Sequence, residues 1–381
     1  MKISVLCFDL SDNAAGRADL LARLLAPLGE VEVIGPRSGA APWAPVAGGS
    51  VCYSGVPERR LPGFFMTMAE LARRADGDLL YASKTRLGSA GIGYLKRVLG
   101  RRGPLFLDID DWEVGFYLRS GPLGTLGRAL NFGNPKGLPW TWLTERLTGL
   151  ADGITVASRF LQQRFGGTLL PHVRDTDEWK PGAGSPVEAR RRLGIGDERV
   201  VMFLGTPRGY KGLDDLGAAV AGLGRKDVRL AVVGTLPESV LGRDLVRRFP
   251  GICLAPPIAF EEIPSFLSAA DVVAVPQRDT PDTRGQVPAK LFDAMALGRP
   301  IVSTRVSMIP EILEGCGLLV KAGDVAALGG AIARLLDDPG EAAALARRAR
   351  ERCVERYSFL SARRDLFPLI AQVMERARGH R

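Results

Sequence analysis

Two cationic side chains stand between a predicted strand and a predicted helix in the second half of the chain. The stretch "FLGTPRGYKGLDDL", residues 203–216, places Arg208 and Lys211 after Gly205 and before a helix expected from about Leu213. Cations beside a helix amino terminus can neutralise a diphosphate, because they add charge-assisted hydrogen bonds to the helix dipole. The competing interpretation is a basic loop that is merely solvated.

A second candidate anion site lies in "GQVPAKLFDAMALGRPIVST", residues 285–304. Pro288 suits the first helical position and Gly298 the position just past the end, so a helix is predicted between a turn and a strand. The backbone N–H groups that precede this helix have no partner within it and could bind an anion. These groups belong to Gly285, Gln286 and Val287.

Two charged residues follow on the same predicted helix. Lys290 and Asp293 are three residues apart and therefore share one face near the amino end. One interpretation is a surface ion pair. The other is that the helix end holds an anionic ligand.

The first half of the chain carries a cluster of acids at the expected carboxyl end of a strand. Asp108, Asp110 and Asp111 follow one another closely, so mutual repulsion could raise the pKa of one of them and make it a base or a hydroxyl binder. The alternative is a helix cap, for which Asp111 is the best candidate. Lys84 and Arg86 follow the strand before, and could bind an acceptor or simply be exposed.

Several common site types are disfavoured. The loop Asp12–Arg17, with Gly16, could approach a ligand, but the GxGxxG pattern of dinucleotide-binding proteins is absent. The two histidines are His172, between Pro171 and Val173, and His380 in the tail, so a nucleophile–histidine triad is not expected.

Composition indicates a globular, basic protein of more than one domain. The 381 residues exceed a prior of about 150 per domain, and 46% are hydrophobic. A formal charge of +9 favours anionic partners, but no basic block with interleaved aromatics indicates nucleic-acid binding. Five scattered cysteines predict neither disulfides nor a zinc site and fit a reducing, cytoplasmic environment. No uncharged apolar run reaches 18 residues, so a membrane-spanning segment is not expected.

Short apolar runs alternate with helix-like stretches in both halves of the chain. Runs without polar alternation indicate strands buried on both faces, so the predicted fold class is α/β, with two Rossmann-like, doubly wound parallel-sheet domains facing a cleft. The hinge is placed in "LLPHVRDTDEWKPGAGSP", residues 169–186. The predicted strands are "ISVLCF", "VEVIG", "DLLYAS", "PLFLDI" and "GITVAS", then "VVMFLG", "RLAVVG", "ICLAP", "DVVAVP" and "PIVST".

The second half, from about 200 to 358, resembles the retaining glycosyltransferases of the GT-B fold known as glycosyltransferase family 4. The matching pieces are "FLGTPRGYKGLDDL", "LAVVG", "IPSFLSAADVVAVPQ", "KLFDAMALGRPIVST", "IPEILEGCGLLVKAGD" and "RCVERYS". The linker "LPHVRDTDEWKP" is similar to the family's hinge, and "ADGITVASRFLQQRF" matches more loosely.

The resemblance implies a retaining, metal-independent glycosyltransferase that moves a sugar from a nucleotide-diphosphate sugar to a hydroxyl acceptor without a cofactor. Arg208 and Lys211 would grip the diphosphate, and Asp293 would replace the glutamate that binds ribose. The other donor contacts would come from Gly205, Lys290, the 285–287 backbone and, from the opposite domain, Gly16. The catalytic candidates are Asp110, Arg208 and Lys211.

This sequence departs from the family pattern at three places. Thr206 stands where the family's arginine follows the glycine, and Gly285 stands where the first acid of a pair is usual, so Asp279 or Asp282 could fill that gap. The amino-terminal histidine is missing, and Asp108 or Asp110 stands nearest. A nucleotide-sugar binder or isomerase of the same fold is the alternative.

Three domains are expected on this basis: an acceptor-side domain over 1–175, a donor domain over 176–357, and a helix over 358–381 that crosses back. Acceptor contacts are expected from Asp108, Asp111, Lys84 and Arg86. The basic, glycine-rich stretches of the first domain suit a small, glycan or lipid-linked acceptor and a peripheral contact with an anionic membrane at its cytoplasmic face.

Overall fold

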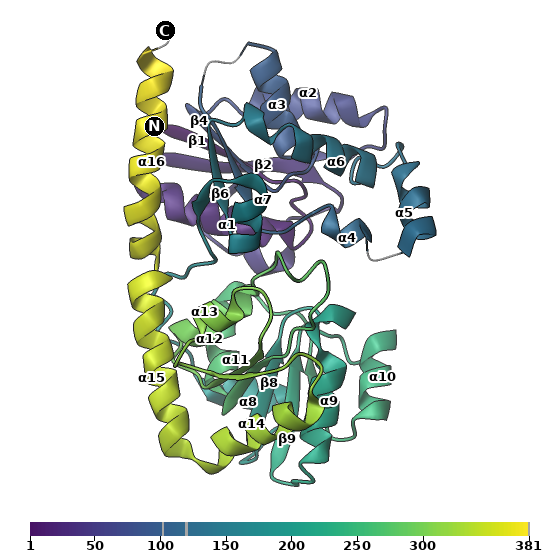
Figure 1. The fold of residues 1–381 in the computed structure, drawn as a ribbon, viewed down its shortest axis with the longest axis vertical. Helices are drawn as coiled ribbons and strands as arrows, with labels where there is room; N and C mark the ends of the chain where they lie inside the picture. Colours follow the sequence, from purple (N-terminus) through teal and green to yellow (C-terminus); the bar gives the residue numbers. More distant parts are fainter. Residues whose placement is uncertain (101–102, 119–120, 380–381) are drawn as a thin grey trace. The chain divides into compact units, whose positions relative to one another are not determined.

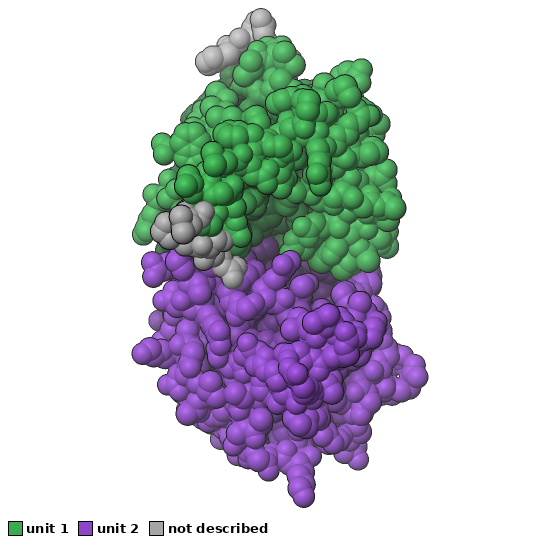
Figure 2. All heavy atoms as spheres, turned by 90° about the vertical axis from the view of Figure 1, so that its right-hand side faces the viewer, with its two compact units in different colours: residues 1–171, 362–381 green, residues 172–361 purple. Residues whose placement is uncertain are grey.

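A computed structural model describes residues 1–100, 103–118 and 121–379 of the chain (Figure 1). His380 and the basic residues at 101, 102 and 119 therefore lie outside the described residues. Two compact units are present, coloured separately in Figure 2. Unit 1 comprises residues 1–171 and 362–381, and unit 2 comprises residues 172–361, so the division falls four residues before the expected boundary at 175.

Unit 1 is built on a seven-stranded parallel sheet of order β3-β2-β1-β4-β5-β6-β7. Its strands are β1 Lys2–Leu6, β2 Glu30–Arg37, β3 Cys52–Pro57, β4 Leu79–Ser83, β5 Leu105–Ile109, β6 Gly153–Val156 and β7 Thr168–Leu169. Its helices are α1 Ala14–Leu25, α2 Phe64–Arg74, α3 Ala90–Val98, α4 Gly115–Leu118, α5 Gly121–Ala129, α6 Leu138–Arg146 and α7 Arg159–Phe165.

Unit 2 repeats the same winding with six parallel strands in the order β10-β9-β8-β11-β12-β13. Its strands are β8 Arg199–Leu204, β9 Val228–Val233, β10 Cys253–Ala255, β11 Val272–Val275, β12 Ile301–Thr304 and β13 Leu318–Val320. Its helices are α8 Pro186–Leu193, α9 Leu213–Gly222, α10 Val240–Arg248, α11 Ile263–Ser268, α12 Ala289–Ala296, α13 Ile309–Ile312, α14 Val325–Asp337 and α15 Pro339–Arg356.

The predicted fold class of two Rossmann-like parallel-sheet domains is confirmed. In each sheet the strand order reverses beside the first strand of the unit, at β1/β4 and at β8/β11. Loops at the carboxyl ends of such strands are where ligands bind in doubly wound sheets. In unit 1 these loops follow Leu6 and Ser83, and in unit 2 they follow Leu204 and Val275.

The cores form because apolar strands are covered by the apolar faces of helices. In unit 1 one cluster joins the strands to α2, α3 and α7, with Phe64, Leu71 and Leu161 fully or almost fully buried. In unit 2 the corresponding cluster joins the strands to α9, α14 and α15. Most strand side chains are therefore apolar, although Ser4, Asp108 and Thr155 are buried polar residues within β1, β5 and β6.

The last helix, α16 Phe359–Gly379, is drawn in yellow in Figure 1 and belongs to unit 1 from residue 362 onward. Arg363 fixes it to the end of α1, because its Nε donates to the Leu24 carbonyl at 3.0 Å and its Nη2 to the Arg23 carbonyl at 3.0 Å. None of the described helices combines the length and the apolar character needed to cross a membrane. All five cysteines are free thiols.

Candidate functional site

The loop between β8 and α9 in unit 2 brings the predicted diphosphate-binding residues to a strand end. Gly205, with φ +112°, turns the chain away from β8, and α9 begins at Leu213 as predicted. Gly212 has φ +69°, and a Cβ there would lie 1.8 Å from the Pro276 carbonyl oxygen. Only glycine allows this approach, which holds the loop against the end of β11.

Two lysines converge on this loop. The Lys211 Nζ donates to the Thr206 carbonyl at 2.8 Å. The Lys290 Nζ lies 3.9 Å from the centroid of the Phe203 ring and 3.4 Å from the position that a Gly205 Cβ would occupy. Arg208 is exposed. The structure therefore brings Lys290 to Gly205, close to the Lys211 charge, and leaves Arg208 extended into solvent.

Burial lowers the pKa of Lys290 well below its ordinary value, and the nearby Lys211 charge lowers it further. Asp293 opposes this shift more weakly. An anion bound beside Lys290 would stabilise the protonated ammonium and so raise its pKa back towards the ordinary value. The pair of lysines is therefore suited to a ligand of high negative charge.

The helix α12 that carries Lys290 begins one residue later than predicted. Pro288 is its N-cap, with φ −65° and ψ 122°, and Ala289 is the first helical residue. Gly298 has φ +58° just beyond the helix, as predicted. The expectation of three unpaired N–H groups before the helix is wrong for Gln286, whose N–H donates to the Thr283 carbonyl at 3.1 Å in a turn.

Asp293 is buried and paired with a residue that the sequence analysis did not select. The Nε of Arg174, in the segment between β7 and α8, donates to Asp293 Oδ1. Arg174 is itself held by the Val173 carbonyl at 2.7 Å and by the ring of Trp179, 5.3 Å away. A Lys290–Asp293 surface pair is thus replaced by a buried Arg174–Asp293 pair. The only sequence signal was an arginine within the segment predicted to be the hinge, residues 169–186.

Burial raises the pKa of Asp293 above its ordinary value, although Arg174 opposes the shift. The two acids suggested as replacements for the missing glutamate lie in other environments. Asp279 is exposed and 3.5 Å from Arg284, whereas buried Asp282 accepts a 2.7 Å hydrogen bond from Thr280. Neither contact joins these acids to Asp293.

In unit 1 the acids after β5 divide into two separate groups. Asp108 is fully buried and accepts two 2.8 Å hydrogen bonds from Arg17 and a third, of 2.8 Å, from Thr155. Arg17 also donates to the Leu170 carbonyl at 2.8 Å. Asp108 therefore fixes α1 to the sheet, and an acceptor could reach its carboxylate only by breaking these bonds.

Asp110 and Asp111 surround the ammonium of Lys84 instead. The Lys84 Nζ lies 2.6 Å from Asp110, 2.8 Å from Asp111 and 3.3 Å from Glu113. Arg86 donates to Glu113 at 2.8 Å through Nε. The interpretation of Lys84 and Arg86 as simply exposed is wrong, because both belong to this ionic cluster, and Lys84 has a φ of +73°.

Burial raises the pKa of Asp110 to about 6, with Lys84 acting in the opposite direction and Asp111 in the same direction. Burial by itself would lower the pKa of Lys84, but the surrounding carboxylates outweigh it and hold the pKa well above the ordinary value. A helix cap at Asp111 is wrong, because α4 begins only at Gly115 and the Asp111 carboxylate accepts from Lys84. Asp110 is thus the acid of this cluster best suited to proton exchange near neutral pH.

The three carboxylates of Asp110, Asp111 and Glu113 have ligand oxygens within 4.8 Å of one another, a spacing that a cation could bridge. The Lys84 Nζ lies within 3.3 Å of each of them and already supplies the compensating charge. A metal would have to displace this ammonium. Gly16 lies in the first turn of α1, which begins at Ala14, and is therefore helical where a loop was expected.

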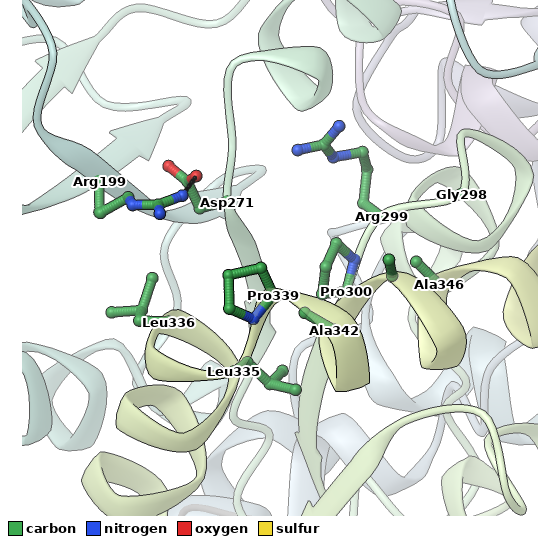
Figure 3. A pocket seen from close by; sticks show the side chains of 11 residues that line it. Arg199, Asp271, Gly298, Arg299, Pro300, Leu335, Leu336, Pro339, Ala342 and Ala346 are labelled. Carbon is green, nitrogen blue, oxygen red and sulfur yellow. Dashed lines mark hydrogen bonds and ion pairs between the residues drawn. The ribbon is translucent and has the colours of Figure 1, made fainter.

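A cavity of about 270 Å³ in unit 2 lies away from these residues (Figure 3). It is lined by Arg199, Asp271 and Arg299, which stand at the beginnings of β8, β11 and β12. Parallel strands place their beginnings at the edge opposite to their ends, so this cavity is separate from the Gly205 loop. It is not part of the candidate site.

Comparison with known proteins identifies the family. The family described as glycosyl transferases group 1 matches residues 198–338. A GDP-mannose-dependent alpha-(1-6)-phosphatidylinositol monomannoside mannosyltransferase of Mycolicibacterium smegmatis is 31% identical over 289 residues, which cover 66% of this chain and 72% of that protein. A D-inositol 3-phosphate glycosyltransferase of Saccharomonospora viridis is 32% identical over 234 residues, covering 56% and 51%.

Solved structures show the same fold at low sequence identity. HepE of Anabaena in complex with UDP and glucose is similar with a TM-score of 0.75 and 19% identity, over 98% of this chain and all of that one. Sucrose-phosphate synthase of Thermosynechococcus elongatus is similar with a TM-score of 0.73 and 20% identity, over 98% and 99%. With two doubly wound parallel sheets and a relative matched over most of its length, the chain belongs to the group 1 glycosyltransferases and is a GT-B glycosyltransferase enzyme.

Proposed function

We propose that this enzyme is a retaining glycosyltransferase that uses a nucleotide-diphosphate sugar and needs neither a metal nor a cofactor. The observation that carries the proposal is the pair of lysines at the Gly205 loop, with Lys290 partly buried beside Phe203 and close to Lys211. A diphosphate would supply the negative charge that this environment lacks. Crystal structures of similar fold hold UDP and UDP-glucose, which supports a nucleotide-sugar donor.

In the proposed reaction the bond between the anomeric carbon and the leaving diphosphate breaks, and a bond from that carbon to the acceptor oxygen forms on the same face. The acceptor proton passes to the departing phosphate oxygen. Lys211 and Lys290, with Arg208 folded back from solvent, would stabilise the developing phosphate charge, a task that a divalent metal performs in other enzymes. Stabilisation of the leaving group is the main requirement, because the transition state resembles an oxocarbenium ion.

We propose that Asp293 contacts the donor ribose, as the resemblance implies, with Arg174 holding its carboxylate in place. On the acceptor side, the Asp110 carboxylate would accept a hydrogen bond from the reacting hydroxyl and orient it, while the proton itself passes to the phosphate. Asp111, Lys84 and Arg86 would support it.

The acceptor is proposed to be a small molecule, a glycan or a lipid-linked molecule, met by a cytoplasmic protein that can contact an anionic membrane face. The relatives support this class, because one is named for a phosphatidylinositol monomannoside acceptor and another for inositol 3-phosphate. An isomerase or a pure nucleotide-sugar binder is not favoured, since the named relatives transfer sugars. The nucleotide base, the sugar and the linkage position are open to experiment.

A thermal-shift panel of nucleoside diphosphates and nucleotide sugars tests the donor proposal. We expect stabilisation by a nucleoside diphosphate, without added metal and in the presence of a chelator, and a loss of this effect in Lys211→Ala. Consumption of the bound sugar nucleotide should require an acceptor. Stabilisation that depends on a divalent ion would contradict metal independence, and acceptor-independent conversion would favour the isomerase.

A further inference from the structure

Unit 1 carries a group of exposed large apolar side chains with exposed arginines on the same segments. Its members are large apolar side chains of α2, of α6 and of the segment between α5 and α6 that remain exposed after folding. We call these residues the apolar surface of unit 1: Phe65, Met66, Leu130, Phe132, Trp142 and Leu143.

Hydrogen bonds and a ring contact join the three segments, so the exposed side chains lie on neighbouring parts of unit 1. The Leu61 N–H donates to the Gly133 carbonyl at 3.3 Å, which fixes the residues before α2 to the segment after α5. The indole N–H of Trp140 donates to the Phe132 carbonyl at 2.9 Å, and its ring packs edge-on against Phe65 at 6.0 Å.

These apolar side chains lie on the outer faces of their helices, so packing within unit 1 does not cover them. Phe65 and Met66 are 50% and 59% exposed although they belong to a helix whose opposite face is buried. On α6, the buried side is formed by Leu138, Thr141 and Thr144, so Trp142 and Leu143 point outward. Clustered exposure of this kind costs solubility and marks an interaction site.

The charge around the surface is positive. Arg59, Arg60, Arg128 and Arg146 are all exposed, and Arg146 lies over the Trp142 ring at 5.0 Å. No Asp or Glu occurs in the sequence from 59 to 69 or from 124 to 144. Of the flanking acids, Glu58 lies 2.7 Å from Lys136, Glu70 lies 2.6 Å from Arg74, and Glu145 is buried and accepts a hydrogen bond from the Val114 N–H.

We infer that the apolar surface of unit 1 docks on an anionic lipid bilayer, with the aromatic and aliphatic side chains entering the interfacial layer and the arginines contacting lipid phosphates. Aromatic and aliphatic residues within a basic rim have the chemistry of an interfacial membrane contact. The inference deepens the proposed membrane contact and depends on no residue of the donor site. It supplies a physical route by which a lipid-linked acceptor reaches unit 1.

Co-sedimentation with phosphatidylcholine vesicles, with and without phosphatidylglycerol, tests this surface on the full chain. We expect binding only with phosphatidylglycerol, weakened by salt. The double substitution Phe65→Ser and Met66→Ser should lower the water-to-vesicle partition coefficient about tenfold or more, because the variant has two fewer apolar side chains to bury in the bilayer interface. Trp142 should make the wild-type fluorescence sensitive to acyl-chain-brominated lipid.

The matched control is Val240→Ser with Leu241→Ser, an adjacent pair at the start of α10 in unit 2 that is 79% and 42% exposed. The control should bind vesicles like the wild type. Equal loss in both double variants, or no wild-type binding to anionic vesicles, would overturn the inference. A change of oligomeric state in Phe65→Ser/Met66→Ser without lipid would assign the surface to a second copy of the chain instead.

Nucleoside diphosphate binding separates this inference from the proposed function. The Phe65→Ser/Met66→Ser variant should keep the wild-type affinity for the nucleotide, which also shows that it folds. If no nucleotide binds to the wild type but vesicles do, the donor proposal fails and the docking surface stands.

Discussion

The substitution Lys290→Met separates the stability of the ligand-free protein from its affinity for a diphosphate. The Lys290 ammonium lies 3.9 Å from the centroid of the Phe203 ring, near Lys211, and its pKa is held well below the ordinary value by burial. Methionine has a similar length and fills the same space without a charge. The ligand-free variant should therefore be as stable as the wild type or more stable by up to about 2 kcal/mol.

The pH dependence of this gain follows from the direction of the shift. Because the folded-state pKa of Lys290 is lowered, the unfolded chain binds more protons between the folded and the ordinary pKa, so wild-type stability rises with pH across that interval. The advantage of the methionine variant should be largest below the folded pKa and should shrink towards the ordinary lysine value. Thermal unfolding should show a rise of about 2–8 °C for 1–2 kcal/mol in a unit of this size.

Affinity should change in the opposite sense. A charge-assisted hydrogen bond to phosphate contributes about 1.5–3 kcal/mol, so nucleoside diphosphate binding should weaken about 10- to 150-fold. In the wild type, binding should also take up a proton, because the diphosphate raises the pKa of Lys290 again. Titration calorimetry in buffers of different ionisation enthalpy measures both quantities, with the exposed Lys226→Met as control.

The reasoning is refuted if Lys290→Met and the control Lys226→Met both bind the nucleotide with the wild-type affinity. It is also refuted if the ligand-free variant is less stable by several kcal/mol, since that result would make Lys290 a structural cation. Unchanged proton uptake in the variant would assign the uptake to another group.

Three further substitutions test other parts of the site. Because the folded-state pKa of Asp110 is about 6, above the ordinary value, the free energy of unfolding of the wild type should fall by about 1–3 kcal/mol as pH rises from about 4 to about 6. Asp110→Asn should abolish this fall. Urea unfolding at several pH values measures it, and the same pH dependence in the variant would contradict the prediction. Arg17→Met should cost about 3–5 kcal/mol by leaving the fully buried Asp108 carboxylate without its partner, and adding Asp108→Leu should recover part of the loss in the same assay. Gly212→Ala should destabilise by at least about 1–3 kcal/mol, whereas Gly209→Ala, whose added Cβ meets nothing within 4 Å, should be near neutral; similar melting temperatures for both would count against the close approach of this loop.

The strands that were predicted from sequence share one property. Ten apolar runs, from "ISVLCF" to "PIVST", coincide with β1, β2, β4, β5, β6 and β8 to β12, because a parallel strand covered on both faces must be apolar throughout. The edge strand β3, "CYSGVP", was not predicted, since it is only partly buried and contains polar and glycine residues. The strands β7 and β13 were not predicted either; both are short and only partly buried.

Side-chain partners were less predictable than elements. Arg17 and Arg174 received no role in the sequence analysis, yet they hold Asp108 and Asp293, which are 91 and 119 residues away. Spacing on one helix favoured a pair between Lys290 and Asp293, but a closer partner arrives from another segment. Local periodicity contains no information about such contacts, because they depend on which loops the sheet order brings together.

The amino-acid sequence by itself determined the α/β class, the repeated winding of the two halves and the cationic loop after β8, since each follows from short-range patterns of burial, turn residues and charge. Only the tertiary structure decided that Lys84 lies among three carboxylates, that Asp108 is occupied by Arg17, and that Lys290 lies over Phe203. The physical reason is that the energy of a buried charge depends on the charges around it in space, and those come from strands and loops far apart along the chain.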